Sequence, residues 1–203
     1  MQDGVTLLKP QIHNVGAYPE SSDERLVARI GAGKRLAMEA LYARHHLNIY
    51  RFVLRLVNDR PTAEDLTSDV FLEVWKQAAR FEGRSQVSTW ILSIAHNKAM
   101  SALRRRTNES IDDESATRIP DSADNAEVIL ERQSEITVLR QCLKQLSPAH
   151  REIIDLVYYH DKSIAEVAKI VGVPQNTAKT RMFYARKQLA DLLRGAGVDS
   201  IAA

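Results

Sequence analysis

The stretch from Ser163 to Leu193, SIAEVAKIVGVPQNTAKTRMFYARKQLADLL, decides the fold of the C-terminal part of the chain. Ser163 can cap a short helix over 164–171, and Gly172 can end it because glycine accepts the positive φ of a tight turn. Pro174 then precedes a second helix, predicted over 175–193. Two helices joined in this way form a helix-turn-helix, a motif that places its second helix in the major groove of DNA.

The second of these helices has two different sides. At 100° per residue, Ala178, Met182, Ala185 and Leu189 share one side, which is predicted to face the core. The other side mixes amides, hydroxyls, cations and an aromatic ring, groups that can bond base edges, contact thymine methyls and hold phosphates. A merely solvated face is the alternative, and an exposed Phe183 argues against it. The residues predicted to contact DNA are Asn176, Thr177, Lys179, Thr180, Arg181, Phe183, Tyr184 and Lys187.

Charge divides the 203 residues into three blocks, although the net charge is only +2. Residues 1–107 carry 16 Lys/Arg and 11 Asp/Glu, residues 108–133 carry 2 and 8, and residues 134–203 carry 10 and 7. Basic surfaces attract polyanions, so the two outer blocks suit nucleic acid. The acidic block contains Pro120 and shows no apolar period up to Asn125, which predicts a flexible linker.

Helical periodicity accounts for the N-terminal block as well. It predicts a helix from about residue 22 that Gly31 interrupts, a second over 34–57, a third over 61–81 and a fourth over 86–106. The third carries Val70, Phe71 and Trp75 in its apolar stripe. No strand-like alternation occurs. The predicted fold is all-α, with two small helical domains joined by a flexible acidic linker and a helix-turn-helix in the second. The boundaries are a leader over 1–20, domains over 21–107 and 130–195, a linker over 108–129 and a tail over 196–203.

The loop before the fourth helix has an unusual composition. Phe81 and Trp90 bracket the polar run EGRSQVST, and the helix ends in three arginines at 104–106. Aromatic side chains beside a basic helix are typical of proteins that bind single-stranded DNA, where bases stack on the rings and cations hold phosphates. The alternative is that Trp90 and Ile91 simply belong to the core.

Two runs of sequence together resemble a known family. Residues 63–106, AEDLTSDVFLEVWKQAARFEGRSQVSTWILSIAHNKAMSALRRR, are similar to the second conserved domain of extracytoplasmic-function (ECF) sigma factors of the sigma-70 family. Residues 146–189, LSPAHREIIDLVYYHDKSIAEVAKIVGVPQNTAKTRMFYARKQL, are similar to the fourth. The likeness extends over about 23–193. It implies a protein that binds core RNA polymerase, through the beta-prime clamp helices and the beta subunit, and directs it to promoter DNA, held inactive by an anti-sigma factor.

The resemblance also implies roles for particular residues. The third helix would dock on the clamp helices, the segment around the fourth would melt and read the −10 element, and the last helix would read the −35 element. Two departures touch the last helix, because Gln175-Asn176 replaces a small-Gly pair and Tyr184 replaces a basic residue of many relatives. The promoter sequence therefore cannot be copied from a relative. The clamp-docking residues implied are Asp65, Leu66, Asp69, Val70 and Glu73. The −10 residues implied are Arg84, Ser85, Gln86, Trp90, Asn97, Arg104 and Arg105.

Other classes of function find little support. The six histidines are scattered and form no nucleophile, metal or phosphate motif, so no catalytic residue, metal or cofactor is predicted. Cys142, the one cysteine, is read as a small buried thiol, with a redox sensor as the alternative. No signal peptide or membrane-spanning run is evident, which predicts a cytoplasmic protein without membrane contact of its own. The competing reading is a dimeric helix-turn-helix regulator that binds duplex DNA without polymerase.

Overall fold

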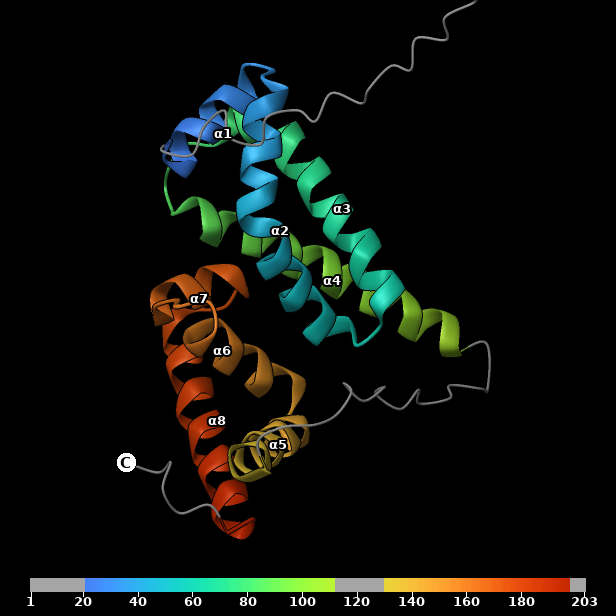
Figure 1. Cartoon of the computed structure of the whole chain (residues 1–203), viewed down its shortest axis with the longest axis vertical. Coiled ribbons are helices and arrows are strands. Elements are labelled where there is room, and N and C mark those ends of the chain that lie inside the picture. The colour runs from blue at the N-terminus through green and yellow to red at the C-terminus, as the bar shows by residue number, and fades with distance from the viewer. Residues whose placement is uncertain (1–20, 112–129, 198–203) are drawn as a thin grey trace, which may run out of the picture.

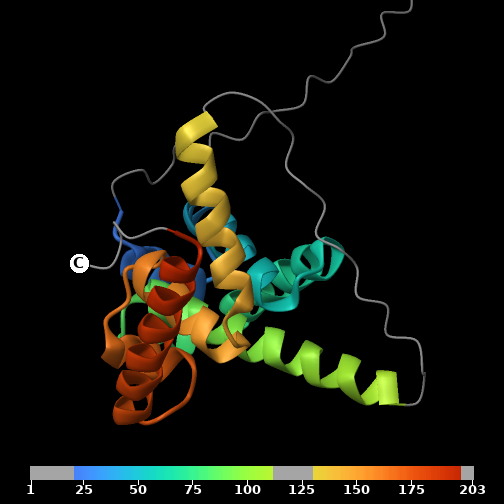
Figure 2. The same cartoon turned by 90° about the horizontal axis from the view of Figure 1, so that it is seen from below.

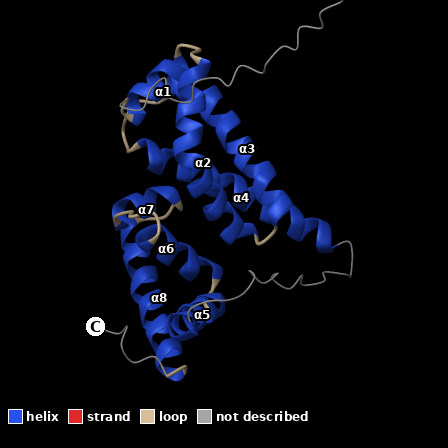
Figure 3. Cartoon of the chain, viewed as in Figure 1, coloured by secondary structure: helices blue, strands red, loops and turns tan. Residues whose placement is uncertain are grey.

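A computed structural model describes residues 21–111 and 130–197 of the chain, and every regular element in these ranges is helical (Figures 1 and 3). This confirms the predicted all-α class. The N-terminal group consists of α1 (Asp23–Gly31), α2 (Arg35–Val57), α3 (Arg60–Gln77), the 3-10 turn η1 (Ala78–Arg80) and α4 (Val87–Ile111). The C-terminal group consists of α5 (Leu130–Gln145), α6 (Pro148–Tyr158), α7 (Ile164–Ile170) and α8 (Gln175–Gly195).

Side chains before the helices determine where several of them begin. Ser22 accepts a hydrogen bond from the Arg25 amide at 3.4 Å, and Asp59 accepts one from the Thr62 amide at 2.9 Å. Such caps satisfy amides that have no partner inside the helix. Pro61 lies in the first turn of α3, where its missing N–H is not needed.

The core of the N-terminal group lies where α2, α3 and α4 cross (Figure 1). Phe52, Val70 and Ile91, one from each helix, are fully buried. Gly31 ends α1 against η1, and a Cβ added there would lie 2.9 Å from the Cα of Ala79. Only glycine therefore fits this crossing without a backbone shift.

The C-terminal group forms the predicted helix-turn-helix. Gly172 makes the turn with φ of 66°, and Ser163 and Glu166 form a capping box at the start of α7. Leu156, Val167 and Ile170 fill the core under α8. Cys142 is only 3% exposed, which agrees with the buried-thiol interpretation.

Some helix ends differ from the prediction. The third helix was predicted to reach residue 81, but α3 ends at Gln77 and the chain tightens into η1. The fourth was predicted to end at 106, whereas α4 continues to Ile111 and projects beyond the rest of its group (Figure 2). Four residues assigned to the linker are therefore helical. The leader, the linker over 112–129 and the end of the tail lie outside the described residues, so the flexibility predicted there stays a prediction.

The two groups contact each other. The start of α4 packs on α7, and α2 contacts α6 (Figure 1). The contact brings residues about 75 positions apart in the sequence within hydrogen-bonding distance.

Candidate nucleic-acid interface

The outer side of α8 presents the predicted DNA-contacting side chains. Ala178 and Ala185 are fully buried against the core, whereas Asn176, Lys179 and Thr180 are exposed. The structure therefore separates the two sides of α8 as the periodicity predicted.

An aromatic pair lies further along the same side of α8. The side chain of Phe183 is 64% exposed and its ring lies 5.4 Å from that of Tyr184, which is 53% exposed. Lys187 is exposed, while Thr177 and Arg181 are partly buried at the edges of the face. All eight predicted residues thus retain access to solvent, and together they offer base-bonding, apolar and cationic groups to a major groove.

The loop between η1 and α4 holds the first of the predicted −10 residues. Arg84 is exposed and pairs with Glu82, and Ser85 is partly buried. Gln86 is exposed, yet its side-chain oxygen accepts a hydrogen bond from Lys162 of the C-terminal group at 3.2 Å. The loop is thus shared between a predicted DNA contact and a contact within the protein.

Trp90 is compatible with both interpretations of the sequence, a residue of the core and a ring on which a base stacks. Its ring is partly buried, packs at the edge of the core and lies 4.7 Å from the ring of Phe81. The sequence reading that bases stack on this pair stays a prediction.

Three of the predicted −10 residues, Trp90, Asn97 and Arg104, lie seven positions apart along α4. Seven residues are almost two full turns, so the three form one stripe with steps of about 10.5 Å. The sequence reasoning named these residues singly and did not use this spacing, although it was available.

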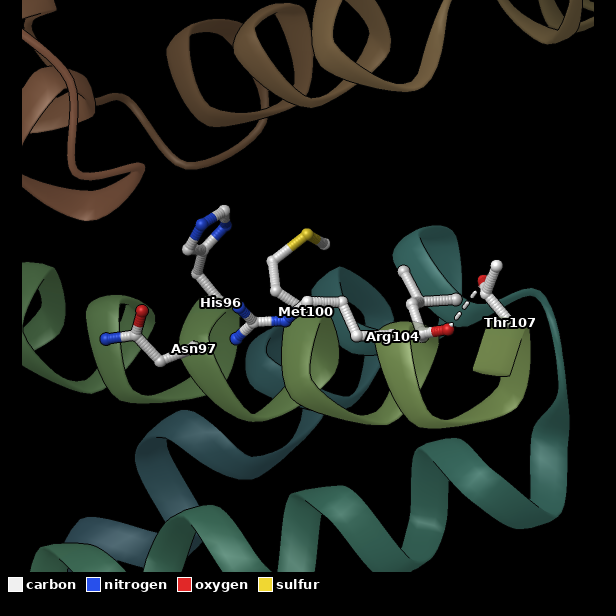
Figure 4. A pocket seen from close by; sticks show the side chains of 6 residues that line it. His96, Asn97, Met100, Arg104 and Thr107 are labelled. Atoms are coloured by element: carbon white, nitrogen blue, oxygen red, sulfur yellow. Dashed lines mark hydrogen bonds between the residues drawn. The ribbon is translucent and has the colours of Figure 1, made fainter. Parts of the chain in front are cut away.

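Asn97 and Arg104 also line a shallow groove of about 500 Å³ on α4 (Figure 4). His96 and Met100 rise from the same groove toward the C-terminal helices (Figure 4). Arg105 is exposed beyond it. The groove mixes polar and apolar side chains, and Arg104 offers a cation there for a phosphate of an extended, negatively charged chain.

The predicted docking face on α3 is only partly at the surface. Asp65 and Asp69 are exposed, and Glu73 is partly exposed and accepts a hydrogen bond from Gln77 at 2.6 Å. Lys98 Nζ of α4 lies 3.9 Å from a carboxylate oxygen of Asp69 and from one of Glu73.

The apolar members of the predicted face differ from the acids. Leu66 is partly buried, and Val70 is fully buried and packs in the core, so its side chain cannot contact a partner in this structure. The structure instead exposes Leu72 by 51% and Trp75 by 38%. Leu72 lies seven residues and Trp75 ten residues after Asp65, at helical spacing, which was the signal available in the sequence. Trp75 had been assigned to the apolar stripe.

Polar side chains join the start of α4 to α7. Lys162 Nζ donates to Ser88 Oγ at 2.7 Å and to Gln86 Oε1 at 3.2 Å, and Thr89 Oγ1 donates to Glu166 Oε1 at 2.7 Å. We call these five residues the α4–α7 seam. Sequence reasoning did not find the seam, because nothing in either segment indicates that they meet.

Burial changes the acid–base properties of the seam. Removal from water lowers the pKa of Lys162, and the nearby Glu166 and Asp161 only partly oppose this. Burial acts to raise the pKa of Glu166, but hydrogen bonds from Thr89 and Ser163 bring it below its usual value. The hydrogen bonds therefore favour the charged form of Glu166, whereas burial disfavours the charged form of Lys162.

Two further pairs join the groups. His96 Nδ1 lies 2.6 Å from Glu152 Oε1, and Arg55 Nε lies 2.9 Å from Asp155 Oδ1. The Arg55 guanidinium also lies 4.3 Å from the centre of the Tyr159 ring. The N-terminal group thus contributes potential cations and the C-terminal group contributes acids.

Within residues 21–111 and 130–197, no three His, Cys, Asp or Glu side chains gather as a metal site. No helix in these ranges has the length and apolar character required to cross a membrane.

Two protein-family models match the chain, one in each helical group. A model described as Sigma-70 region 2 matches residues 41–109, and one described as Sigma-70, region 4 matches residues 136–189. The chain belongs to the sigma-70 family, in its group of ECF RNA polymerase sigma factors. Sigma factors are not catalysts, and the chain is accordingly not an enzyme.

The chain matches curated ECF sigma factors along nearly their whole length. The chain is 28% identical over 176 residues to ECF RNA polymerase sigma factor SigL of Mycobacterium tuberculosis, covering 85% of this chain and 97% of SigL. It is 27% identical over 177 residues to ECF RNA polymerase sigma factor SigK of Mycobacterium bovis, covering 85% of this chain and 95% of SigK.

Solved structures give the same fold. The sigma factor RpoE of Bartonella quintana, solved in complex with the anti-sigma factor NepR, matches with a TM-score of 0.64 and 27% identity over 75% of this chain and 94% of that chain. CnrH, solved in complex with the cytosolic domain of CnrY, matches with a TM-score of 0.63 and 21% identity over 86% of this chain and 99% of that chain, a likeness of fold.

Proposed function

We propose that the chain binds core RNA polymerase and directs it to promoters, with α8 reading the −35 element and the α4 segment reading and melting the −10 element. The observation that carries this proposal is the outer face of α8. There Asn176, Lys179 and Thr180 are exposed beside Phe183, on the second helix of a helix-turn-helix in a sigma-70 family member. An exposed aromatic ring among base-bonding side chains has a use in a major groove and none in water.

The stripe on α4 supports the assignment of the −10 element. Trp90 offers a ring for a base, Asn97 offers an amide next to it along the helix, and Arg104 offers a cation for the phosphates. Catching an unstacked base offsets a few kcal/mol of the cost of opening the duplex. The proposed domain boundaries follow this division, 21–107 for the −10 and polymerase contacts and 130–195 for the −35 contacts.

The exposed side of α3 supports a polymerase contact. Acidic Asp65 and Asp69 lie beside exposed Leu72 and Trp75, a combination suited to a basic partner with an apolar centre. We assign the beta-prime clamp helices to this face, with Leu72 and Trp75 in place of Val70.

An anti-sigma factor is the remaining partner that we propose. The relative RpoE was solved in complex with one. If this chain is controlled in the same way, the protein isolated from its own cells should elute with a bound partner and transcribe poorly, whereas the protein made alone should be active.

Reconstituted transcription tests the main proposal. Core polymerase with the chain should initiate at specific members of a promoter library, and core polymerase alone should not. Specific duplex binding by the chain without polymerase, and no stimulation of transcription, would favour the dimeric regulator instead.

The docking face can be tested separately. Reversal of the charge of Asp69 and Glu73 should weaken retention on immobilised core polymerase, while changes at such surface positions usually alter stability by under about 0.5 kcal/mol. Glu24→Lys with Glu39→Lys, at exposed positions of α1 and α2 outside α3, makes the same change of charge and is the matched control. Retention equal to that of the parent protein would refute the docking assignment.

A further inference from the structure

One side of α2 carries apolar side chains that the described helices leave exposed. Leu36 is 40% exposed and Leu47 is 46% exposed, and Ala43 between them is exposed as well. With the partly buried Ala40 they recur at steps of four, three and four residues, so they share one side of the helix. We call Leu36, Ala40, Ala43 and Leu47 the α2 stripe.

The α2 stripe lies opposite the side of the helix that builds the core. Leu41 and Phe52 are fully buried on that other side, where α2 contacts α1, α3 and α4. Single exposed apolar residues are normal on a protein surface. A row of them with the spacing of a packed helix face instead indicates a surface that another segment contacts.

The N-terminal end of the described chain is held beside this stripe. Arg44 Nη1 donates to the Ser21 backbone oxygen at 2.7 Å and to Asp23 Oδ1 at 2.8 Å. Arg44 follows Ala40 by four residues and precedes Leu47 by three, so it neighbours the α2 stripe on the helix surface. The hydrogen bond to Ser21 therefore fixes the point where the leader over 1–20 joins the fold, next to the stripe.

The leader has the length and composition to pack there. The α2 stripe spans eleven residues of helix, about 16 Å, whereas the nine residues from Ile12 to Ser21 can extend over roughly 30 Å. Only three of residues 1–20 are charged. A segment of this kind gains free energy by leaving water, unlike the acidic linker. The larger aliphatic residues of the leader are Val5, Leu7, Leu8, Ile12 and Val15.

We propose that residues 5–12 of the leader pack on the α2 stripe and add a layer to the N-terminal group. The tether favours this contact, because a linked segment has an effective concentration on the order of millimolar. A contact too weak to hold two separate molecules together can therefore hold the leader. The proposal replaces the flexibility predicted for the leader with a packed segment, and it does not depend on the proposed function.

Paramagnetic broadening of amide signals tests this contact in the full chain. A nitroxide is attached at Gln11→Cys in a Cys142→Ala background, and the amide signals of α2 are compared before and after the nitroxide is reduced. The unreduced nitroxide should broaden the signals of the α2 stripe. The leader joins the fold next to α2, so a segment that does not pack would also broaden them to some extent, and variants must separate the two cases.

Leu47→Glu removes an apolar contact and places a charge in the stripe, at an exposed position where the fold tolerates it. The ratio of packed to unpacked leader should therefore fall about tenfold or more, and the broadening with it. Asn48→Glu is the matched control, since it adds the same charge at the next position, which is exposed and outside the stripe. It should leave the broadening unchanged. Leu8→Glu makes the reciprocal change in the leader, outside α2, and should reduce the broadening as Leu47→Glu does.

Two results would overturn the proposal. The first is equal broadening in the parent, Leu47→Glu and Leu8→Glu proteins, which would mean that the leader only passes near the stripe. The second comes from a mixture in which one population carries the isotope label and the other carries the nitroxide. Broadening of the stripe in that mixture would show that a second copy of the chain, and not the leader of the same molecule, occupies it.

Discussion

The two helices proposed to read the promoter, α4 and α8, have very different surroundings. α4 packs against α2 and α3, and against α7 at its start, so its side chains are shared between the core, the seam and the proposed DNA contacts. α8 packs on α5, α6 and α7 with one side and leaves the other to solvent. On α8 the residues that hold the fold and those proposed to bind DNA are different residues.

This difference indicates where sequence can change without loss of the fold. Substitutions on the outer side of α8 alter the proposed reading surface alone. On α4, Trp90 packs at the edge of the core and Gln86 bonds to the other group, so a change there affects both structure and recognition. Promoter preference should therefore diverge more freely at the −35 element than at the −10 element.

The largest expected contrast is in stability. Ile91→Ala on α4 removes a fully buried side chain and should lower the free energy of unfolding by about 2–5 kcal/mol. Phe183→Ala on α8 removes a ring that is 64% exposed and should change it by less than about 0.5 kcal/mol. Urea denaturation followed by circular dichroism measures both. Comparable losses would show that the outer side of α8 contributes to the stability of the fold.

The next contrast separates recognition from attachment on α8. Thr180→Ala or Asn176→Ala should change which upstream element is preferred, with about 1–3 kcal/mol of discrimination per affected base. Lys179→Ala should weaken all promoters alike and lower the salt slope by roughly one unit. Transcription from a randomised upstream element at several salt concentrations measures this. If the Lys179 variant changes the preference while the other two retain it, the reading face has been assigned wrongly.

A smaller effect is expected at α7, which lies between the two reading helices. Ser163→Ala removes the hydroxyl that caps α7 and should cost about 1 kcal/mol, because the Glu166 amide loses its acceptor. Ser163→Thr keeps a capping oxygen and serves as the control. Thermal unfolding of the two variants measures the difference, and equal midpoints would mean that the cap contributes nothing.

The smallest effect concerns pH. The pKa of Glu166 is lowered in the folded protein, so its charge stabilises the fold above pH 4.5, and this contribution is lost as pH falls through the lowered pKa. Lys162 has the opposite sense: its lowered pKa makes the folded form more favourable as pH rises toward 10.5. The difference in unfolding free energy between the parent and Glu166→Gln should shrink by a few tenths of a kcal/mol below pH 4.5. A constant difference would contradict this.

Local signals in the sequence predicted most of the fold. Gly172, Pro61 and the apolar stripes marked where helices begin, end and face the core, because these depend on residues within a few positions of each other. The extension of α4 past Arg106 was missed, since the polar residues there show no apolar period. Val70 was assigned to the docking surface, but the structure places its side chain in the core, and the exposed Leu72 was overlooked.

The seam depends on a different kind of information. Thr89 and Glu166 lie 77 residues apart, and each has an adequate local explanation, as a residue in a helix's first turn and as part of a capping box. Only the packing of α4 on α7 brings them together. A single sequence contains no periodicity that specifies such a contact.

The position of the tryptophans also provides an intrinsic fluorescent probe of the N-terminal group. The chain has two tryptophans, Trp75 and Trp90, and both belong to the N-terminal group, whereas the C-terminal group absorbs through tyrosine. Excitation at the red edge of indole absorption therefore produces emission from the N-terminal group and almost none from the C-terminal group. With Trp75→Phe, the remaining indole emission of the free chain comes from Trp90, the residue proposed to meet the first unpaired bases, so the surroundings of that ring can be followed without an attached dye.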